Sequence, residues 1–145
     1  MLSYTCKAAI KAVLYLASRE THARSSIREI AEAIGASEHT TAKMLQQLAR
    51  QRLIGSSKGP SGGFFITRDQ LNQPLITIVS AIDGKDLFTE CGLGLSRCSA
   101  SHPCPLHDQY KAARDQIRLL FETTAIHELA LKVKTGLSFL ADEAG

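Results

Sequence analysis

The sequence has no long hydrophobic run. None of its 145 residues lies in a stretch of the roughly 18 uninterrupted apolar positions that a membrane span requires. The most apolar segment, residues 8–17, is interrupted by Lys11 and is not followed by a small-residue cleavage site. It therefore predicts an amphipathic helix rather than a signal peptide. We expect a cytoplasmic protein with no membrane partner.

The residue patterns of common enzymes are also missing. The sequence contains no Ser-His-Asp order, no phosphate-binding loop and no paired carboxylates placed for acid–base catalysis. It has no internal repeat and no low-complexity tail. These absences predict a protein that is not an enzyme, and a chain of this length can build one core without disulfides.

Cysteine is scarce, and its few copies are clustered. Three of the four cysteines, Cys91, Cys98 and Cys104, lie within 18 residues, whereas Cys6 stands apart near the start of the chain. Thiols stay reduced in the cytoplasm, where clustered cysteines bind metal more often than one another. We therefore expect a metal or cluster site, and we expect Cys6 to be a small structural residue.

Acidic residues are few in the first half of the chain. Residues 1–68 carry ten Lys and Arg against four Asp and Glu, whereas residues 69–145 carry seven against ten. The overall net charge of +3 conceals this asymmetry. A basic front half indicates a module that binds a polyanion, joined to a second part with another task.

The pattern of the front half predicts a helix-turn-helix. A first helix is expected over residues 3–19, with Ala9, Val13, Leu16 and Ala17 at helical spacing. Ser26 is placed as the N-cap of a short helix that ends at Gly35, and Glu29 could complete a capping box. Its apolar face comprises Ile27, Ile30, Ala31 and Ile34. Ser37 caps the next helix, in which Met44, Leu45 and Leu48 face inward. Any helical hairpin would give a similar pattern.

A β-hairpin directly after the second of these helices favours a winged helix. Strands are expected over 53–57 and 64–67, with a tip over 58–63 that contains Lys58, three glycines and a proline. This architecture places the second helix in the DNA major groove and lets the wing contact neighbouring phosphates. The alternative is a hairpin that only completes the core.

The second half of the chain predicts a dimer. We expect a short helix over 74–84, a cysteine-rich loop, a long helix beginning at Pro105 and a final helix over about 124–141. The long helix has apolar residues at spacings of three and four: Leu106, Tyr110, Ala113, Ile117, Leu120 and Phe121. A stripe outside the winged-helix core needs a partner, and a symmetric copy matches the half-site logic of helix-turn-helix proteins.

The expected fold is therefore mainly α with a small β-hairpin: a winged helix-turn-helix domain plus a long dimerisation helix. We divide the chain into a DNA-binding domain over 1–84, a cysteine-rich loop over 85–107, and a dimerisation helix and C-terminal helix over 105–145.

The chain resembles the bacterial winged-helix transcription regulators of the IscR, NsrR and CymR type. The resemblance rests on "AAIKAVLYLA", "IREIAEAIGASEHTTAKMLQQL", "KGPSGGFFIT", "ITIVSAIDG" and the three clustered cysteines. It implies a homodimer, expected to be a repressor, that binds palindromic double-stranded promoter DNA under the control of an iron–sulfur cluster. The implied DNA-binding residues are Ser37, His39, Thr40, Thr41, Lys43, Lys58, Gly59, Ser61 and Gly62. Ala42 and Arg52 depart from the family pattern, which has a glutamate and a glycine there in some members.

The expected ligands are Cys91, Cys98, Cys104 and His107, holding a [2Fe-2S] or [4Fe-4S] cluster. Wide spacing suits a bulky cluster, whereas structural zinc prefers closer pairs. A zinc-based or thiol-based regulator and an electron-transfer or cluster-carrier protein are the alternatives.

The fourth ligand has more than one candidate. With Pro105 as the first helical residue, Cys104 would be near the N-cap, where the helix dipole favours a thiolate. His107 would then lie one residue beyond the point from which it could reach back. His102 is expected to be a solvated loop residue, and Cys6 supplied by the partner subunit is the next candidate.

Overall fold

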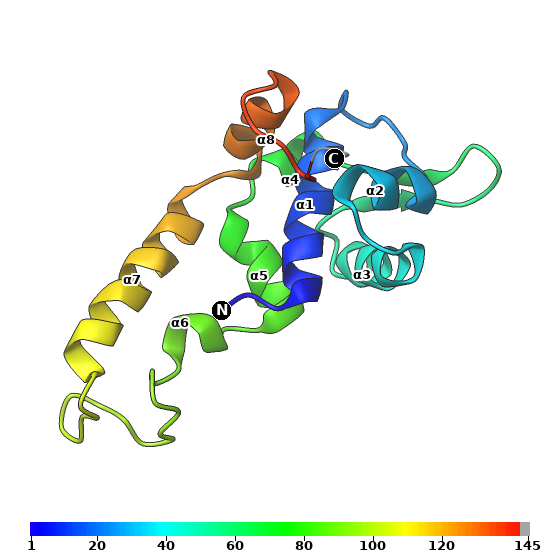
Figure 1. Cartoon of the computed structure of the whole chain (residues 1–145). Helices are drawn as coiled ribbons and strands as arrows, with labels where there is room; N and C mark the ends of the chain where they lie inside the picture. Colours follow the sequence, from blue (N-terminus) through cyan, green and yellow to red (C-terminus); the bar gives the residue numbers. More distant parts are fainter. Residues whose placement is uncertain (143–145) are drawn as a thin grey trace.

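A computed structural model describes residues 1–142 as a helical fold with one β-hairpin (Figure 1). The elements are α1 (Tyr4–Ser18), α2 (Ile27–Ile34), α3 (Glu38–Arg50), β1 (Gly55–Ser57), β2 (Gly63–Phe65), α4 (Arg68–Leu71), α5 (Leu75–Asp83), α6 (Asp86–Thr89), α7 (His107–Thr123) and α8 (Ile126–Lys134). The antiparallel strands pair Gly55 with Phe65 and Ser57 with Gly63. The mainly helical class with a small hairpin is confirmed.

Serine caps fix the starts of the first three helices. The hydroxyls of Ser3, Ser26 and Ser37 accept hydrogen bonds from backbone N–H groups in the first turns of α1, α2 and α3, at 3.0, 3.1 and 3.1 Å. Such caps satisfy donors that have no partner within the helix. The two predicted caps are confirmed, and the helix-turn-helix begins where the sequence places it.

One core holds the winged helix together. α1 packs against α2, α3, α5 and α8, and the side chains in this core include Val13, Leu16, Leu45, Ile78 and Ile126, each at most 1% exposed. The inward residues predicted for α2 and α3 lie in or against this core. Apolar burial of this extent is the main force that fixes α3 relative to α1.

The wing is tied to the loop that precedes α2. Ser25 and Phe64 exchange backbone hydrogen bonds, both of 2.9 Å. The hairpin is shorter than expected, because β1 and β2 cover only three residues each and Gly63 belongs to β2 rather than to the tip. The short α4 was not predicted from the sequence. Its N-terminus is fixed by a reciprocal capping box between Thr67 and Gln70.

Arg52, which departs from the family pattern, occupies a position at the end of α3 that favours glycine. The Leu53 N–H donates to the Leu48 carbonyl and the Arg52 N–H to the Ala49 carbonyl, both at 3.0 Å, which is the Schellman pattern of a helix C-terminus. Arg52 occupies its left-handed position with φ of 60°. At the corresponding position after α2 stands Gly35, with φ of 68°. Arg52 therefore carries strain that glycine would not.

We expect Arg52→Gly to stabilise the protein. The gain should be about 1 kcal/mol, because the left-handed cost for a residue with a Cβ exceeds the extra backbone entropy that glycine loses on folding. A thermal melt should show a rise of about 2–4 °C for a chain of this size. Gly35→Arg is the mirror-image control and should lower the melting temperature. An unchanged or lower melting temperature for Arg52→Gly would contradict the argument.

α7 stands away from the core as an arm (Figure 1), and none of its side chains is buried. Its start differs from the prediction: the helix begins at His107, not Pro105, because residues 104–107 form a turn in which the His107 N–H donates to the Cys104 carbonyl at 3.1 Å. Cys104 thus precedes the helix by a turn and does not cap it.

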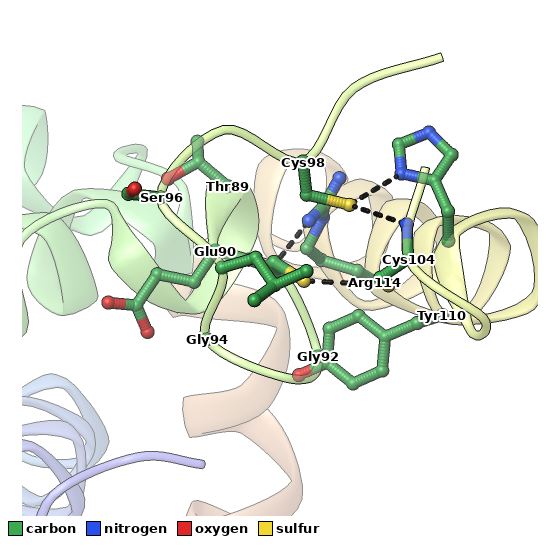
Figure 2. A pocket seen from close by; sticks show the side chains of 12 residues that line it. Thr89, Glu90, Gly92, Gly94, Ser96, Cys98, Cys104, Tyr110 and Arg114 are labelled. Atoms are coloured by element: carbon green, nitrogen blue, oxygen red, sulfur yellow. Dashed lines mark hydrogen bonds between the residues drawn. The ribbon is translucent and has the colours of Figure 1, made fainter. Parts of the chain in front are cut away.

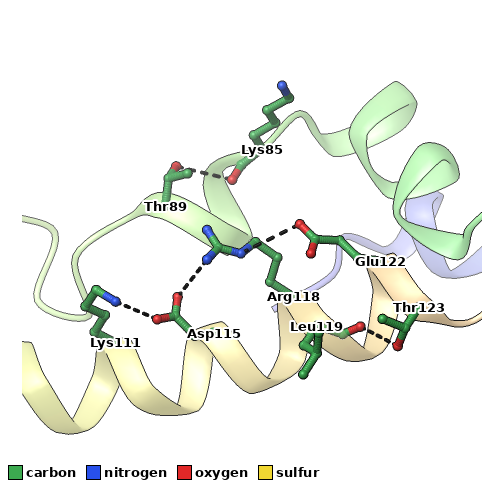
Figure 3. A network of polar contacts seen from close by, with 8 residues as sticks. All are labelled: Lys85, Thr89, Lys111, Asp115, Arg118, Leu119, Glu122 and Thr123. Carbon is green, nitrogen blue, oxygen red and sulfur yellow. Dashed lines mark hydrogen bonds and ion pairs between the residues drawn. The ribbon is translucent and has the colours of Figure 1, made fainter.

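An ion-pair network runs along one face of α7 and comprises Lys111, Asp115, Arg118 and Glu122 (Figure 3).

The predicted stripe on α7 lies on one side of the helix and is covered by its own subunit only in part. Phe121 packs edge-on against the buried Phe88 of α6, with ring centroids 5.7 Å apart, and Tyr110 lies against Gly92. Both therefore serve their own subunit. Tyr110 nevertheless remains 40% exposed, and Leu106, Ile117 and Leu120 of the stripe are 43, 38 and 56% exposed.

The last helix is shorter than predicted. α8 ends at Lys134, and the chain then turns at Gly136, with φ of 79° and the Leu137 N–H bonded to the Lys132 carbonyl at 2.9 Å. The final part of the predicted 124–141 helix is therefore wrong. α8 folds back on α1, as expected, and places Ile126 in the core. The short α6 interrupts the region predicted as a cysteine-rich loop.

Candidate metal centre and nucleic-acid interface

Three thiols converge between α6 and α7. The Sγ atoms of Cys91, Cys98 and Cys104 all lie within 4.8 Å of one another, and those of Cys91 and Cys104 are 3.5 Å apart. The Nδ1 atom of His107 lies 3.1 Å from the Cys98 Sγ (Figure 2). All four cysteines of the chain are free thiols. The structure thus brings together the three cysteines that the sequence predicted as ligands, with the predicted His107 beside Cys98.

Backbone turns aim the thiols inward. The Gly94 N–H donates to the Cys91 carbonyl at 2.9 Å, and Ser99 and His102 exchange backbone hydrogen bonds of 3.2 and 3.1 Å. Two further backbone donors point at sulfur: the Leu93 N–H at the Cys91 Sγ and the Cys104 N–H at the Cys98 Sγ, both 3.4 Å away. Donors in this arrangement favour the thiolate form, which is the form that binds metal.

Tyr110 covers the loop beside Cys91. A Cβ added to Gly92 would lie 2.7 Å from the Tyr110 ring, so the ring rests directly on the loop backbone. Figure 2 shows the two residues in contact below the cysteines. This role of Tyr110 was not predicted from the sequence. The signal was the spacing of His107, Tyr110 and Arg114, which places them on one side of a helix.

The thiols differ in acidity. Hydrogen bonds from the backbone N–H groups of Leu93 and Leu95 lower the pKa of Cys91 to about 7. Burial raises the pKa of Cys104, although a hydrogen bond from the backbone N–H of Leu106, at the start of α7, lowers it in part. Burial, with the nearby charge of Asp83, raises the pKa of Cys6 to about 12.

The structure also separates the candidates for the fourth ligand. His107 lies in the first turn of α7, and its Nδ1 atom lies beside the sulfur of Cys98. His102 is exposed in the loop, as expected. Cys6 is 0% exposed and packs with Val79 and Phe88, which bears out its structural role. A protonated thiol inside its own subunit is a poor metal ligand.

A cavity of about 460 Å³ opens in front of the thiols. It is lined by Thr89, Glu90, Cys91, Gly92, Gly94, Leu95, Ser96, Cys98, Cys104, His107, Tyr110 and Arg114 (Figure 2). One water molecule occupies about 30 Å³ in the liquid, so this space exceeds what a single ion needs.

The start of α3 presents a mixed surface. His39 and Lys43 are exposed, whereas Ser37 uses its hydroxyl to cap the helix. Thr40 is half-buried. Thr41 is 0% exposed, and its hydroxyl donates to the Ser37 carbonyl at 2.7 Å. Of the residues expected to meet DNA on this helix, Thr41 lies in the core rather than at the surface.

The wing exposes Lys58, Gly59 and Ser61 at its tip. The Arg24 guanidinium donates to the Ser61 carbonyl at 3.2 Å and holds the tip near the start of the helix-turn-helix. A Cβ on Gly62 would lie 2.2 Å from the Ser57 carbonyl oxygen, so Gly62 is needed for the turn itself. The tip therefore offers one cation on a tightly folded backbone.

Comparison with known proteins identifies the family. The family model Rrf2, described as an iron-dependent transcriptional regulator, matches residues 2–132. The chain belongs to the Rrf2 family. This establishes a transcription regulator of a family that binds DNA, and not an enzyme.

Individual Rrf2 proteins are similar over most of their length. An HTH-type transcriptional regulator of Aquifex aeolicus is 27% identical over 131 residues, which are 89% of this chain and 90% of that protein. The regulator IscR of Xenorhabdus nematophila is 24% identical over 121 residues, covering 83% of this chain and 73% of the relative. The expected kinship with IscR is confirmed.

Solved structures share the fold. CymR, the global cysteine regulator of B. subtilis, superposes with a TM-score of 0.74 at 18% identity, covering 92% of this chain and 98% of CymR. IscR of T. potens gives a TM-score of 0.73 at 16% identity, with 95% and 91% covered. The winged-helix architecture of this Rrf2 chain is confirmed. Within residues 1–142, no helix is long and apolar enough to cross a membrane.

Proposed function

We propose that this chain is a homodimeric transcription regulator whose binding to promoter DNA is controlled by an iron–sulfur cluster on Cys91, Cys98, Cys104 and His107. The observation that carries the proposal is the convergence of three thiols and one imidazole nitrogen on a single open cavity between α6 and α7. Thiolates are the usual cluster ligands, and imidazole replaces some of them in known centres.

The residues present fit such a cluster. The cavity has room for a multi-iron group, and two backbone N–H groups point at the sulfurs. Donors around the sulfurs tune cluster potentials. When bound, the cluster would supply a group that responds to redox state, reactive gases or iron supply.

The position of the loop suggests how occupancy reaches DNA. The four ligands lie between the end of α6 and the first turn of α7, so their joint attachment to one group would fix the start of α7. We expect α7 to pair with its copy in a partner subunit. A change at the loop would then alter the distance between the two α3 helices, and half-site spacing decides whether a dimer fits its operator.

Zinc is the second candidate. In tetrahedral zinc–thiolate sites with Zn–S bonds of about 2.3 Å, sulfur atoms lie about 3.8 Å apart. The 3.5 Å between the Cys91 and Cys104 sulfurs and the 4.8 Å limit for the set also suit one such ion. The size of the cavity favours the cluster.

Anaerobic purification separates the two. We expect a coloured protein with visible charge-transfer bands and with iron and acid-labile sulfide bound in matching amounts. Exposure to air should bleach the bands. A colourless protein containing one zinc per chain would contradict the cluster proposal and support the second candidate.

The wing should contribute through Lys58. We expect Lys58→Ala to weaken binding to a palindromic promoter and to reduce the slope of log affinity against log salt. The reduction should be about 0.9 for each phosphate that the lysine no longer neutralises, hence about 2 in a dimer. Fluorescence anisotropy at several salt concentrations measures both quantities. Lys132→Ala, which removes an exposed lysine from the last turn of α8, is the matched control. Equal slopes for the two variants would argue against a wing contact.

A further inference from the structure

Arg114 reaches from α7 into the cysteine cavity. It lies about two turns beyond His107, and its Nη1 donates to the carbonyl of Glu90 at 2.6 Å. Glu90 is the residue directly before Cys91. One side chain therefore connects the long helix to the backbone that carries the first thiol (Figure 2).

The guanidinium has an unused donor. The Nε of Arg114 is buried and has no hydrogen-bond partner among residues 1–142. Buried donors in folded proteins are almost always paired, so this one is an exception. The Nε has no accessible surface toward the cavity and no sulfur within hydrogen-bonding distance. It is therefore the charge of Arg114, which lines the cavity in front of the thiols, that can act on a group bound there.

The charges in the cavity point to the nature of this group. The cavity is lined by three thiols, one imidazole and the carboxylate of Glu90. Among the described residues that line it, Arg114 is the one Lys or Arg. Deprotonated thiols on a metal or cluster leave the site with an excess of negative charge. Arginine suits such a partly buried anion, because its guanidinium remains charged and is weakly hydrated.

We propose that Arg114 is a positioning residue for the metal–thiolate assembly: its charge stabilises the anionic sulfurs of Cys91, Cys98 and Cys104, while its Nη1 holds the Glu90 carbonyl. The inference rests on the proposed function in that a metal or cluster occupies the site. Arg114 then makes the position of α7 depend on that occupancy, in addition to the link through His107.

Three variants test the role. Arg114→Gln removes both the positive charge and the guanidinium group, whereas Arg114→Lys keeps the charge without the guanidinium. Arg118→Gln is the matched control. Arg118 lies one turn further along α7, where it pairs with Asp115 and Glu122 outside the cysteine cavity. Circular dichroism and the melting temperature establish that each variant is folded.

The first readout is cobalt binding to metal-free protein, followed by the sulfur-to-Co²⁺ charge-transfer band. Arg114→Gln should weaken Co²⁺ binding by about 10- to 100-fold, as is typical when a group supporting metal ligands is removed. Arg118→Gln should match the original protein. The second readout is the midpoint potential of the cluster-loaded protein, which should shift to more negative values in Arg114→Gln and largely recover in Arg114→Lys.

The outcomes separate the two proposals. A protein that holds no cluster, but whose Co²⁺ affinity falls in Arg114→Gln and recovers in Arg114→Lys, overturns the cluster and supports the role of Arg114. A cluster whose potential is unchanged in Arg114→Gln overturns that role. Equal losses of Co²⁺ affinity in the Gln and Lys variants also overturn it, because Arg114 would then only anchor the Glu90 carbonyl.

Discussion

Cys98→Ser is expected to abolish the cluster and leave a folded protein. The visible bands should disappear, and bound iron should fall to near zero, because Cys98 is the central thiol and the one that His107 contacts. Its other contacts are with the Cys104 N–H and the sulfurs of Cys91 and Cys104, and the core of α1, α3, α5 and α8 does not include it. Anaerobic spectra, iron analysis and circular dichroism together measure the result.

Cys6→Ala is the matched control for this variant. Cys6 is buried beside Val79 and Phe88, and its raised pKa keeps it a thiol, so the alanine variant should retain the full bands with a small loss of stability. A bleached Cys6→Ala protein would show that Cys6 of the partner subunit is the fourth ligand. Loss of folding in Cys98→Ser would instead indicate a metal that holds the structure together.

The two histidines provide a second matched pair. His107→Ala should lower cluster content or alter the spectrum, whereas His102→Ala should not, because the exposed His102 ring has no cysteine among its hydrogen-bond partners in residues 1–142. Identical spectra for the two variants would remove His107 from the ligand set.

The winged helix could be predicted from the sequence because its signals are local. A serine before a helix, a glycine after it and apolar residues at spacings of three and four each act within one or two turns. Ser26, Gly35 and Ser37 therefore lie where the sequence placed them. The glycine-rich tip of the wing is equally local, although its pairing ends one residue from where the pattern suggested.

The start of α7 could not be predicted in the same way. Pro105 is well suited to a first helical position, but tertiary placement of the cysteines decides where the helix begins. The loop must bring Cys98 and Cys104 together, and this draws residues 104–107 into a turn. Because the helix begins at His107, this side chain projects from the first turn of α7, where it lies beside Cys98.

The apolar pattern of α7 was ambiguous for a different reason. Phe121 packs against Phe88 of its own subunit and Tyr110 rests on Gly92 while 40% exposed, whereas Ile117 and Leu120 on the same side of the helix are exposed. Periodicity indicates that residues share a face and does not say whose surface covers it. Arg114 escaped notice because a charged residue on a helix is usually solvated, and only the cavity beside it shows otherwise.

Leu120→Asp is expected to convert the dimer to monomers. Ile117 and Leu120, three positions apart on one side of α7, are 38 and 56% exposed on a helix with no buried side chain, and this surface is the one we propose to meet its copy. A two-fold interface uses each patch twice, so one substitution inserts two carboxylates. At about 2 kcal/mol for each truncated anchor, the dimer dissociation constant should rise roughly a thousandfold.

Analytical ultracentrifugation measures this change, and Leu137→Asp controls for it. Leu137 is also exposed but follows α8, so its replacement should leave the dimer intact. The Leu120→Asp monomer should keep its cluster, since all four proposed ligands come from one chain, and should lose tight binding to a palindrome while retaining weak binding to a half-site. A dimer that persists would place the interface elsewhere. A monomer that loses its cluster would mean that the partner subunit completes the site.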